Sequence, residues 1–168
     1  MRTALQALDR RLKKPTKLLI GGGAAMLLAH RCPLSTMDID GVIFQSALTQ
    51  AELDPHVKAV AKELSIPPDW LNPYFNTFLY TLPADFRERL VPIYGGTHLS
   101  VLALSAEDLL ILKCFAARPK DVPHARVLYR KARHPELVDD HLQRLVERNV
   151  PGAQEAWDFF AELEDAGR

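Results

Sequence analysis

The feature that most constrains the fold is an apolar run that ends in three glycines. Residues 17–20 (KLLI) lead into Gly21, Gly22 and Gly23, and the Ala-, Met- and Leu-rich residues 24–30 follow. A short apolar run bounded by glycine is typical of a buried strand, and glycine permits a tight turn after it. We therefore predict a strand over 17–20 and a short buried helix over 24–30.

The glycine turn has two interpretations. It can be a tight turn that packs the helix on the strand. Its backbone N–H groups can also face a phosphate, because the N-terminal end of a helix carries partial positive charge. The spacing lacks both the G-x-G-x-x-G pattern and the Gly-Lys-Ser/Thr of a Walker A loop. The glycines alone leave the two interpretations open.

A pair of aspartates, Asp38 and Asp40, lies inside a second strand, which we predict over 38–44. Side chains at i and i+2 share a face of a strand, so the two carboxylates point the same way and Ile39 points opposite. Ionised carboxylates side by side repel, and Mg²⁺ (or Mn²⁺) relieves the repulsion by taking oxygen ligands from both. Alternatively, one aspartate caps a turn and the other is solvated at the strand end. Together with the glycine turn, the pair predicts a site for a nucleoside triphosphate and its metal ion.

The rest of the chain predicts a small sheet followed by helices. Asp54 is a candidate N-cap with Pro55 at the first helical position, and Gly95-Gly96 is a hairpin signal. Further strands are predicted over 75–82, 90–94 and 98–104, and further helices over 3–14, 55–64, 109–117, 123–133, 136–148 and 152–165. We expect an α+β (α/β-like) fold with a small mixed sheet. It forms a single domain over 1–168, with a sheet-containing core at about 15–104 and a mostly helical part at 105–168.

The stretch IGGGAAMLLAHRCPLSTMDID, which ends at Asp40, resembles the motif of the polymerase-β-type nucleotidyltransferase superfamily. That motif is a Gly-Gly or Gly-Ser turn, then about ten or more residues, then Asp-x-Asp. The pattern is most similar to the AbiEii-like branch, which comprises nucleotidyltransferase toxins of prokaryotic toxin–antitoxin and phage-defence systems and related uncharacterised proteins. The resemblance implies that Gly21–Gly23 and Thr36 contact the nucleotide and that Asp38 and Asp40 hold the metal ion.

A second block, LSAEDLLILKCFAARPKD at residues 104–121, is similar to the later motif of that branch. There a Leu-Leu-x-x-Lys helix is followed by Arg-x-Lys-Asp. The resemblance implies catalytic roles for Lys113 and Asp121, with Lys113 near the triphosphate or the substrate. From the residues alone, Lys113 can also snorkel or form a salt bridge on a buried helix, and Asp121 can be the N-cap of the next helix.

The chain departs from the family pattern in two respects that bear on activity. Leu34 stands where the family has an arginine before the threonine. Active members also carry a third carboxylate on a later strand, where it helps to hold metal and to activate the attacking hydroxyl. The later strands predicted here contain no acid. Glu107, Asp108 and Asp121 are the candidates to replace it.

Composition excludes some classes of function. Lys+Arg and Asp+Glu both number 21, so bulk charge gives no argument for binding to nucleic acid or to a membrane. The charged, amphipathic N-terminus does not match a signal peptide, and no apolar run approaches the ~20 residues that span a bilayer. Cys32 and Cys114 have no metal-site spacing, and we predict that Cys114 is a core residue. We expect a cytoplasmic protein without a membrane partner.

These features support three hypotheses of function. The first is a Mg²⁺-dependent nucleotidyltransferase that moves a nucleoside monophosphate from an NTP to an unidentified acceptor. The resemblance suggests RNA or a protein as acceptor, and a cognate partner protein. The second is a catalytically inactive nucleotide-binding or protein-interaction module of the same fold. The third is an α+β domain whose partner surface the sequence does not reveal. A carboxylate close to Asp38 and Asp40 would favour the first.

Overall fold

The computed structural model describes residues 1–33 and 36–167, without the side chain of Lys120. Leu34, where the chain departs from the family pattern, therefore lies outside the described residues. Among the helices of the described part, none has the length and apolar character needed to cross a bilayer.

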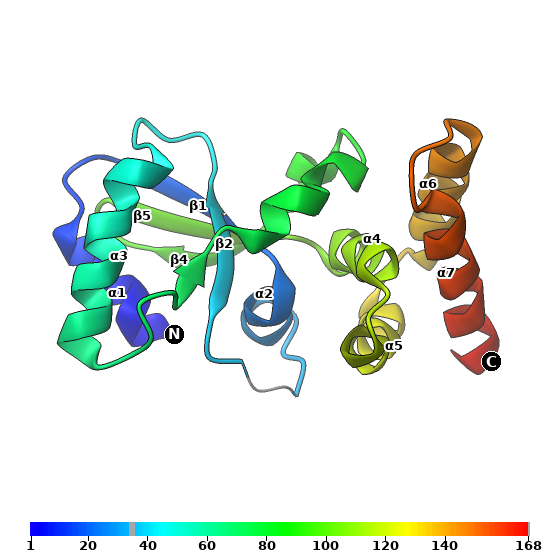
Figure 1. Ribbon diagram of the computed structural model, residues 1–168, viewed down its shortest axis with the longest axis horizontal. Helices are drawn as coiled ribbons and strands as arrows, with labels where there is room; N and C mark the ends of the chain where they lie inside the picture. Colours follow the sequence, from blue (N-terminus) through cyan, green and yellow to red (C-terminus); the bar gives the residue numbers. More distant parts are fainter. Residues whose placement is uncertain (34–35, 168) are drawn as a thin grey trace. The chain divides into compact units, whose positions relative to one another are not determined.

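The chain divides into two compact units, and each is a discontinuous piece of the sequence. Unit 1 comprises Met1–Asn76 and Leu90–Leu104. Unit 2 comprises Thr77–Arg89 and the residues from Ser105 onward. Figure 1 shows the chain coloured along its length from blue to red. The sheet belongs to unit 1, whereas unit 2 is helical.

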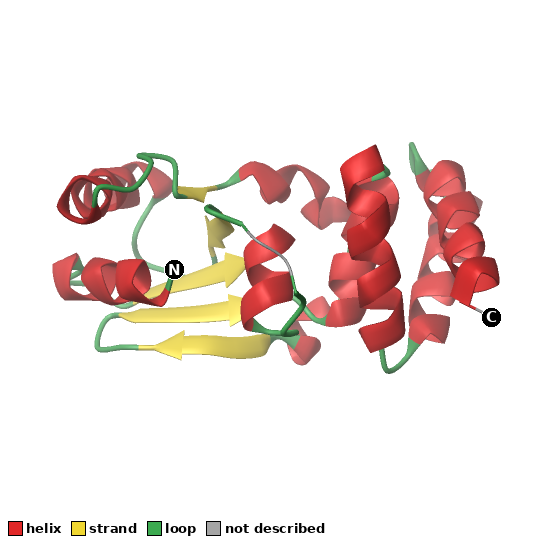
Figure 2. Ribbon diagram, turned by 90° about the horizontal axis from the view of Figure 1, so that it is seen from below, coloured by secondary structure: helices red, strands yellow, loops and turns green. Residues whose placement is uncertain are grey.

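Unit 1 is built around a mixed sheet. Its strands are β1 (Thr16–Ile20), β2 (Ile39–Ile43), β3 (Leu71–Asn72), β4 (Val91–Gly95) and β5 (Leu99–Ala103). In the described part of the chain these five strands pair in the order β3-β2-β1-β5-β4. β1 runs antiparallel to β2 and parallel to β5, β3 runs parallel to β2, and β4 runs antiparallel to β5, as Figure 2 shows for the last pair. This confirms the predicted α+β class with a small mixed sheet.

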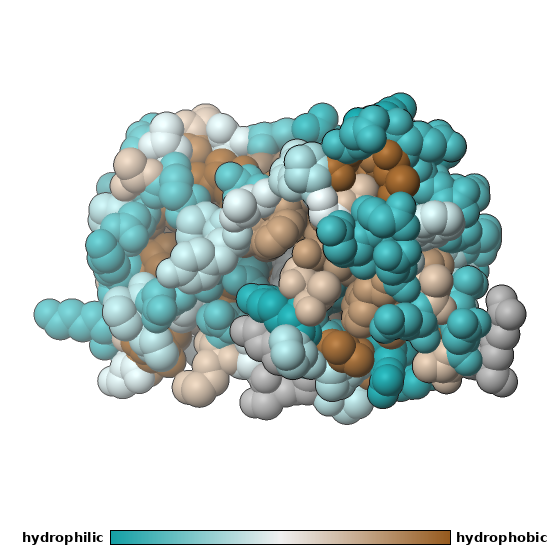
Figure 3. All heavy atoms as spheres, turned by 45° about the vertical axis from the view of Figure 1, so that its right-hand side comes forward, coloured by the Kyte–Doolittle hydropathy of each residue, from teal (hydrophilic) through white to brown (hydrophobic). Residues whose placement is uncertain are grey.

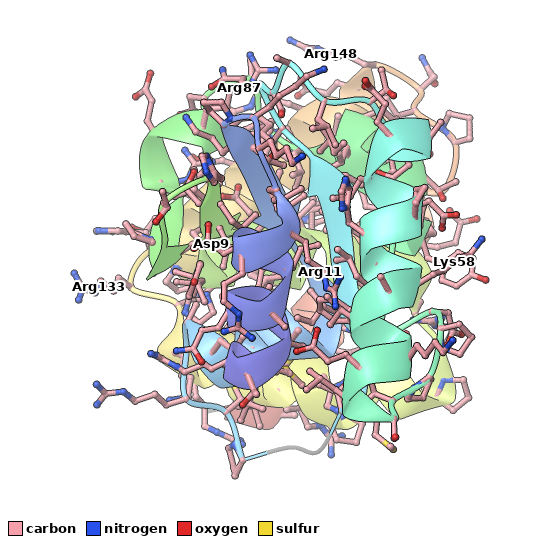
Figure 4. All side chains as sticks on the ribbon, turned by 90° about the vertical axis from the view of Figure 1, so that its left-hand side faces the viewer. Asp9, Arg11, Lys58, Arg87, Arg133 and Arg148 are labelled. Carbon is pink, nitrogen blue, oxygen red and sulfur yellow. The ribbon has the colours of Figure 1, made fainter. Side chains whose placement is uncertain are left out.

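The unit 1 helices are α1 (Arg2–Arg11), α2 (Gly22–Leu28) and α3 (Gln50–Leu64). α1 and α3 lie side by side, and Figure 4 shows them in front of the strands. The Arg11 guanidinium reaches across to the carboxylate of Glu63 at 2.6 Å. The leucines of α1 that face the core are fully buried, in the helical spacing that predicted this helix.

The start of α3 differs from the prediction that Asp54 caps it. The helix begins at Gln50, because Thr49 and Glu52 form a capping box. The Thr49 hydroxyl oxygen accepts from the Glu52 N–H at 3.3 Å, and the Glu52 carboxylate accepts from the Thr49 N–H at 2.8 Å. This pairing satisfies two backbone donors at the helix end, so Pro55 lies inside the helix.

Asp9 joins α1 to the β4–β5 hairpin. Its buried carboxylate accepts from the backbone N–H groups of Thr97, His98 and Leu99 at 3.0, 2.8 and 2.7 Å. The Tyr94 hydroxyl lies 3.4 Å from the same carboxylate. The predicted hairpin at Gly95-Gly96 is confirmed, and one side chain satisfies three donors of its turn.

Unit 2 is a group of helices around one apolar helix. The helices are α4 (Ala106–Ala116), α5 (Val122–Lys131), α6 (Pro135–Glu147) and α7 (Ala153–Gly167), with the short 3₁₀ helices η2 (Phe86–Arg89) and η3 (Pro119–Asp121). A further 3₁₀ helix, η1 (Tyr74–Thr81), begins in unit 1 and ends in unit 2. α4 packs against the other three α-helices, and its leucines and Cys114 are buried, as its nearly uniform apolar sequence predicts. The Ser105 hydroxyl oxygen caps α4 by accepting from the Asp108 N–H at 3.1 Å.

Polar side chains cover most of the molecular face in Figure 3, with small apolar patches between them.

The strand predicted over 75–82 is wrong, because η1 occupies this segment. Its backbone is satisfied locally, for example by the Asn76 N–H, which donates to the Pro73 carbonyl at 3.0 Å. The short strand β3 lies instead just before it, in residues for which the sequence predicted neither a strand nor a helix. Two residues carry too little periodicity to predict a strand, and β3 exists because it pairs with β2.

Candidate functional site

The glycine turn lies directly against the second aspartate. β1 and β2 pair so that Ile20 is opposite Gly41, and the Gly21 N–H donates to the Asp40 carbonyl at 2.9 Å. Gly22 has a φ of +57°, and a Cβ at this position would overlap Oδ2 of Asp40. Only glycine suits both the left-handed backbone and the lack of space. The Asp40 carboxylate therefore lies against bare backbone at the turn.

The third glycine brings the first aspartate to the same place. A Cβ on Gly23 would lie 3.2 Å from Cβ of Thr36, so Thr36 packs closely against the turn. The Thr36 hydroxyl donates to Oδ1 of Asp38 at 2.6 Å. The turn, the threonine and both aspartates thus form one cluster in unit 1, although Asp38 comes fifteen residues after Gly23 in the sequence.

The first glycine has a packing role. A Cβ on Gly21 would lie 2.9 Å from Cδ2 of the buried Phe75 ring. The two interpretations of the glycine turn therefore apply to different residues. Gly21 leaves room for an aromatic side chain, whereas Gly22 and Gly23 leave room for the polar cluster.

The two aspartates follow the predicted alternation. β2 begins at Ile39, one residue after Asp38. Asp38 is exposed, Ile39 is fully buried, and Asp40 is half-buried. The carboxylates therefore lie on the accessible side while the isoleucine between them fills the core.

A neighbouring strand adds a polar residue that the sequence did not reveal. β3 pairs with β2 so that Asn72 is opposite Asp40. The buried Asn72 amide directs its Nδ2 toward Oδ2 of Asp38 at 3.4 Å, and its Oδ1 accepts from the Tyr74 N–H at 3.2 Å. Asn72 occupies a later strand beside the aspartates, which is where the family resemblance places a third carboxylate. The only local signal was an Asn-Pro dipeptide, which is typical of a turn.

The donor set of this cluster fits a hard cation. Carboxylate, amide and hydroxyl oxygens are the ligands that Mg²⁺ prefers, and Asp38 and Asp40 supply two carboxylates at one accessible edge. Thr36 and Asn72, which donate to Asp38, are both neutral. Among the residues that the structure describes, no third Asp, Glu, His or Cys joins the pair in a group that could hold a metal. Within the described part of the chain, the cluster thus carries negative charge for a cation without a third acid.

Lys113 and Asp121 lie together in unit 2. The Lys113 ammonium contacts Oδ1 of Asp121 at 2.6 Å, and Nε of Arg118 contacts Oδ2 at 2.6 Å. Burial raises the pKa of Asp121, but the bonds from Arg118 and Lys113 outweigh burial and bring the pKa below its ordinary value. Of the alternatives for Lys113, the structure shows the salt bridge. Asp121 precedes α5 as predicted, but it makes no side-chain cap bond.

The candidates to replace the third acid have partners within unit 2. Asp108 is fully buried, accepts from the Ser105 hydroxyl at 2.7 Å, and pairs with Arg89 at 2.8 Å. Glu107 accepts from the backbone N–H groups of Arg133 and His134 at 2.8 and 3.3 Å. Both carboxylates therefore stabilise the helical unit.

Comparison with known protein families identifies the family of the chain. Residues 2–132 match the model of a family described as "Nucleotidyltransferase of unknown function (DUF6036)". The match includes the glycine turn, the aspartate pair and the segment with Lys113 and Asp121. No significant match is found among curated proteins or among solved structures. The family match covers most of the chain, and the protein belongs to this family of nucleotidyltransferases.

Proposed function

We propose that the chain transfers a nucleoside monophosphate from an NTP to a hydroxyl acceptor, with Mg²⁺ or Mn²⁺ held by Asp38 and Asp40. The observation that carries this proposal is the contact between the side-chain-free backbone of Gly22 and the Asp40 carboxylate. It brings an aspartate pair against a turn where a phosphate chain can approach the backbone closely. The family membership supports the same class of reaction.

Each residue of the cluster has a distinct part in this proposal. Gly22 and Gly23 admit the phosphates, and Gly21 supports the turn by packing on Phe75. Asp38 and Asp40 hold the metal ion, which when bound neutralises charge on the phosphate oxygens. Thr36 orients Asp38 by its hydrogen bond, and the family resemblance assigns it a contact with the nucleotide.

Lys113 and Asp121 contribute to this proposal through the Lys113 ammonium group. Asp121 is fully buried and contacts the Lys113 ammonium, so the lysine side chain has a fixed position. The resemblance to the AbiEii-like motif assigns that ammonium to the triphosphate or the substrate. RNA or a protein with a hydroxyl side chain is the acceptor that this branch suggests. A cognate partner protein in a toxin–antitoxin or phage-defence system belongs to the same proposal.

A second candidate function is nucleotide binding without transfer. It is favoured by the lack, among the described residues, of a third acid beside Asp38 and Asp40. In such a module the same cluster would bind a metal–NTP complex and report it to a partner, without activating an acceptor hydroxyl.

Transfer assays separate the two functions. The full chain is incubated with Mg²⁺, each α-labelled NTP, and RNA or protein acceptors. Transfer of label is expected from the wild type, with a loss of about 100-fold or more in Asp38→Asn and Asp40→Asn. Asp69→Asn is the matched control, since Asp69 is an exposed aspartate of the same unit.

The same variants are then melted with and without Mg²⁺ and NTP. Stabilisation of the wild type and of Asp69→Asn, but not of the two site variants, without any transfer would establish the binding module. If Mg²⁺ and NTP stabilise none of the proteins and no label is transferred, both functions are refuted.

A further inference from the structure

We propose that Asn72 is the positioning residue of the cation site, a neutral donor that fixes the Asp38 carboxylate before a metal ion binds. The inference rests on the proposed function, because it concerns the same aspartate pair. It assigns a role to a residue outside both sequence motifs.

Hydrogen-bond donors face both oxygens of the Asp38 carboxylate. Oδ1 accepts from the Thr36 hydroxyl at 2.6 Å, and Oδ2 faces the Asn72 amide at 3.4 Å. Asp38 is exposed and precedes β2, so the strand itself does not fix its side chain. Donors at both oxygens restrict rotation of the carboxylate, and a preorganised ligand loses less entropy when it binds a metal ion.

The Asn72 side chain is itself held rigidly. Its Oδ1 accepts from the Tyr74 N–H two residues later, which is an Asx turn and directs Nδ2 toward Asp38. Its strand is fixed on β2, where the Ile39 N–H donates to the Trp70 carbonyl at 2.6 Å. The Trp70 indole N–H donates in turn to the Val57 carbonyl at 3.0 Å. A buried residue with this support can determine the orientation of an exposed one.

The charge of the cluster also favours an amide at position 72. An acid at position 72 would place a third carboxylate beside Asp38 and opposite Asp40. Three adjacent carboxylates repel strongly without a cation, whereas an amide donates to Asp38 and adds no charge. Asparagine therefore favours an ordered site in the metal-free protein, and the affinity for a cation is lower than an acid would give.

The test is the affinity of the full chain for Mn²⁺ alone, measured by calorimetry and by the Mn²⁺ paramagnetic resonance signal. Asn72→Ala should weaken binding about tenfold, the lower end of what outer-shell partners contribute. Asn72→Asp should bind Mn²⁺ more tightly than the wild type while its metal-free form melts at a lower temperature. Asn76→Ala is the matched control, since Asn76 is an exposed asparagine of the same segment.

The outcomes separate this inference from the proposed function. If the wild type binds Mn²⁺ no more tightly than Asp38→Asn and Asp40→Asn do, both the role of Asn72 and the proposed function are refuted. If the wild type binds Mn²⁺ at the aspartates but Asn72→Ala and Asn72→Asp share its affinity, only the role of Asn72 is refuted. A merely structural Asn72 would lower the melting temperature of Asn72→Ala and leave its Mn²⁺ affinity unchanged. Asn72→Asp retains an oxygen for the Asx turn, so the test remains informative if the alanine variant unfolds.

Discussion

Replacing Gly22 by alanine tests the geometry of the glycine turn. At a φ of +57° an alanine is destabilised by about 1–2 kcal/mol relative to the usual backbone regions. Its Cβ would also overlap Oδ2 of Asp40, and turning that carboxylate off its rotamer costs about 0.5–1.5 kcal/mol. Together these effects predict a loss of about 1.5–3.5 kcal/mol in the free energy of unfolding. The displaced carboxylate should also weaken Mn²⁺ binding.

Urea denaturation and Mn²⁺ titration of Gly22→Ala measure the two effects separately. Gly95→Ala is the matched control, because a Cβ on Gly95 would meet no atom within 4 Å. The control should stay within about 0.5 kcal/mol of the wild type and bind Mn²⁺ equally well. A Gly22→Ala protein with the stability and the Mn²⁺ affinity of Gly95→Ala would refute the claim that the turn positions Asp40.

Further predictions concern the residues that hold each unit together. In urea denaturation at neutral pH, the free energy of unfolding of Asp9→Asn should be about 2–3 kcal/mol lower than that of the wild type, since hydrogen bonds to a charged group contribute this much. Burial raises the pKa of Asp9, but its backbone donors outweigh burial and bring the pKa below 3.8. The difference in stability between the wild type and Asp9→Asn should therefore shrink as the pH falls below that value. The free energy of unfolding of Asp121→Ala should be about 3–5 kcal/mol lower than that of the wild type, because the substitution leaves the Lys113 ammonium without its buried partner. A Lys113→Met/Asp121→Leu double variant should lose less in the same assay. Cys32 and Cys114 are buried, so a thiol reagent should modify them only in denaturant; rapid modification of the native protein would contradict this.

The strongest local patterns in the sequence predicted most of the sheet. Four predicted strands match observed ones, and both ends of each lie within one residue of the observed ends: 17–20, 38–44, 90–94 and 98–104. An apolar run stopped by glycine and a hairpin signal are both local features, so the chain reveals them without its tertiary partners. The alternation around Ile39 likewise indicated correctly which side chains are accessible.

The features that depend on distant partners were not predictable. β3 is two residues long and is defined by its pairing with β2, and Asn72 becomes part of the cluster only through that pairing. The aromatic segment at 75–82 has the composition of a strand, but its backbone is satisfied within a 3₁₀ helix. The role of Phe75 against Gly21 also required the fold, because the two residues are remote in sequence.

The order of the strands has a consequence for the newly made chain. β1 is buried on both sides of the sheet, but its parallel neighbour β5 begins only at Leu99. Before β5 has emerged from the ribosome, β2 can pair with one edge of β1, and the edge of β1 that β5 will occupy stays open. An open apolar edge invites pairing with other chains. Synthesis that stalls between β3 and β5 should therefore leave an aggregation-prone intermediate in which the aspartates and the glycine turn have already emerged.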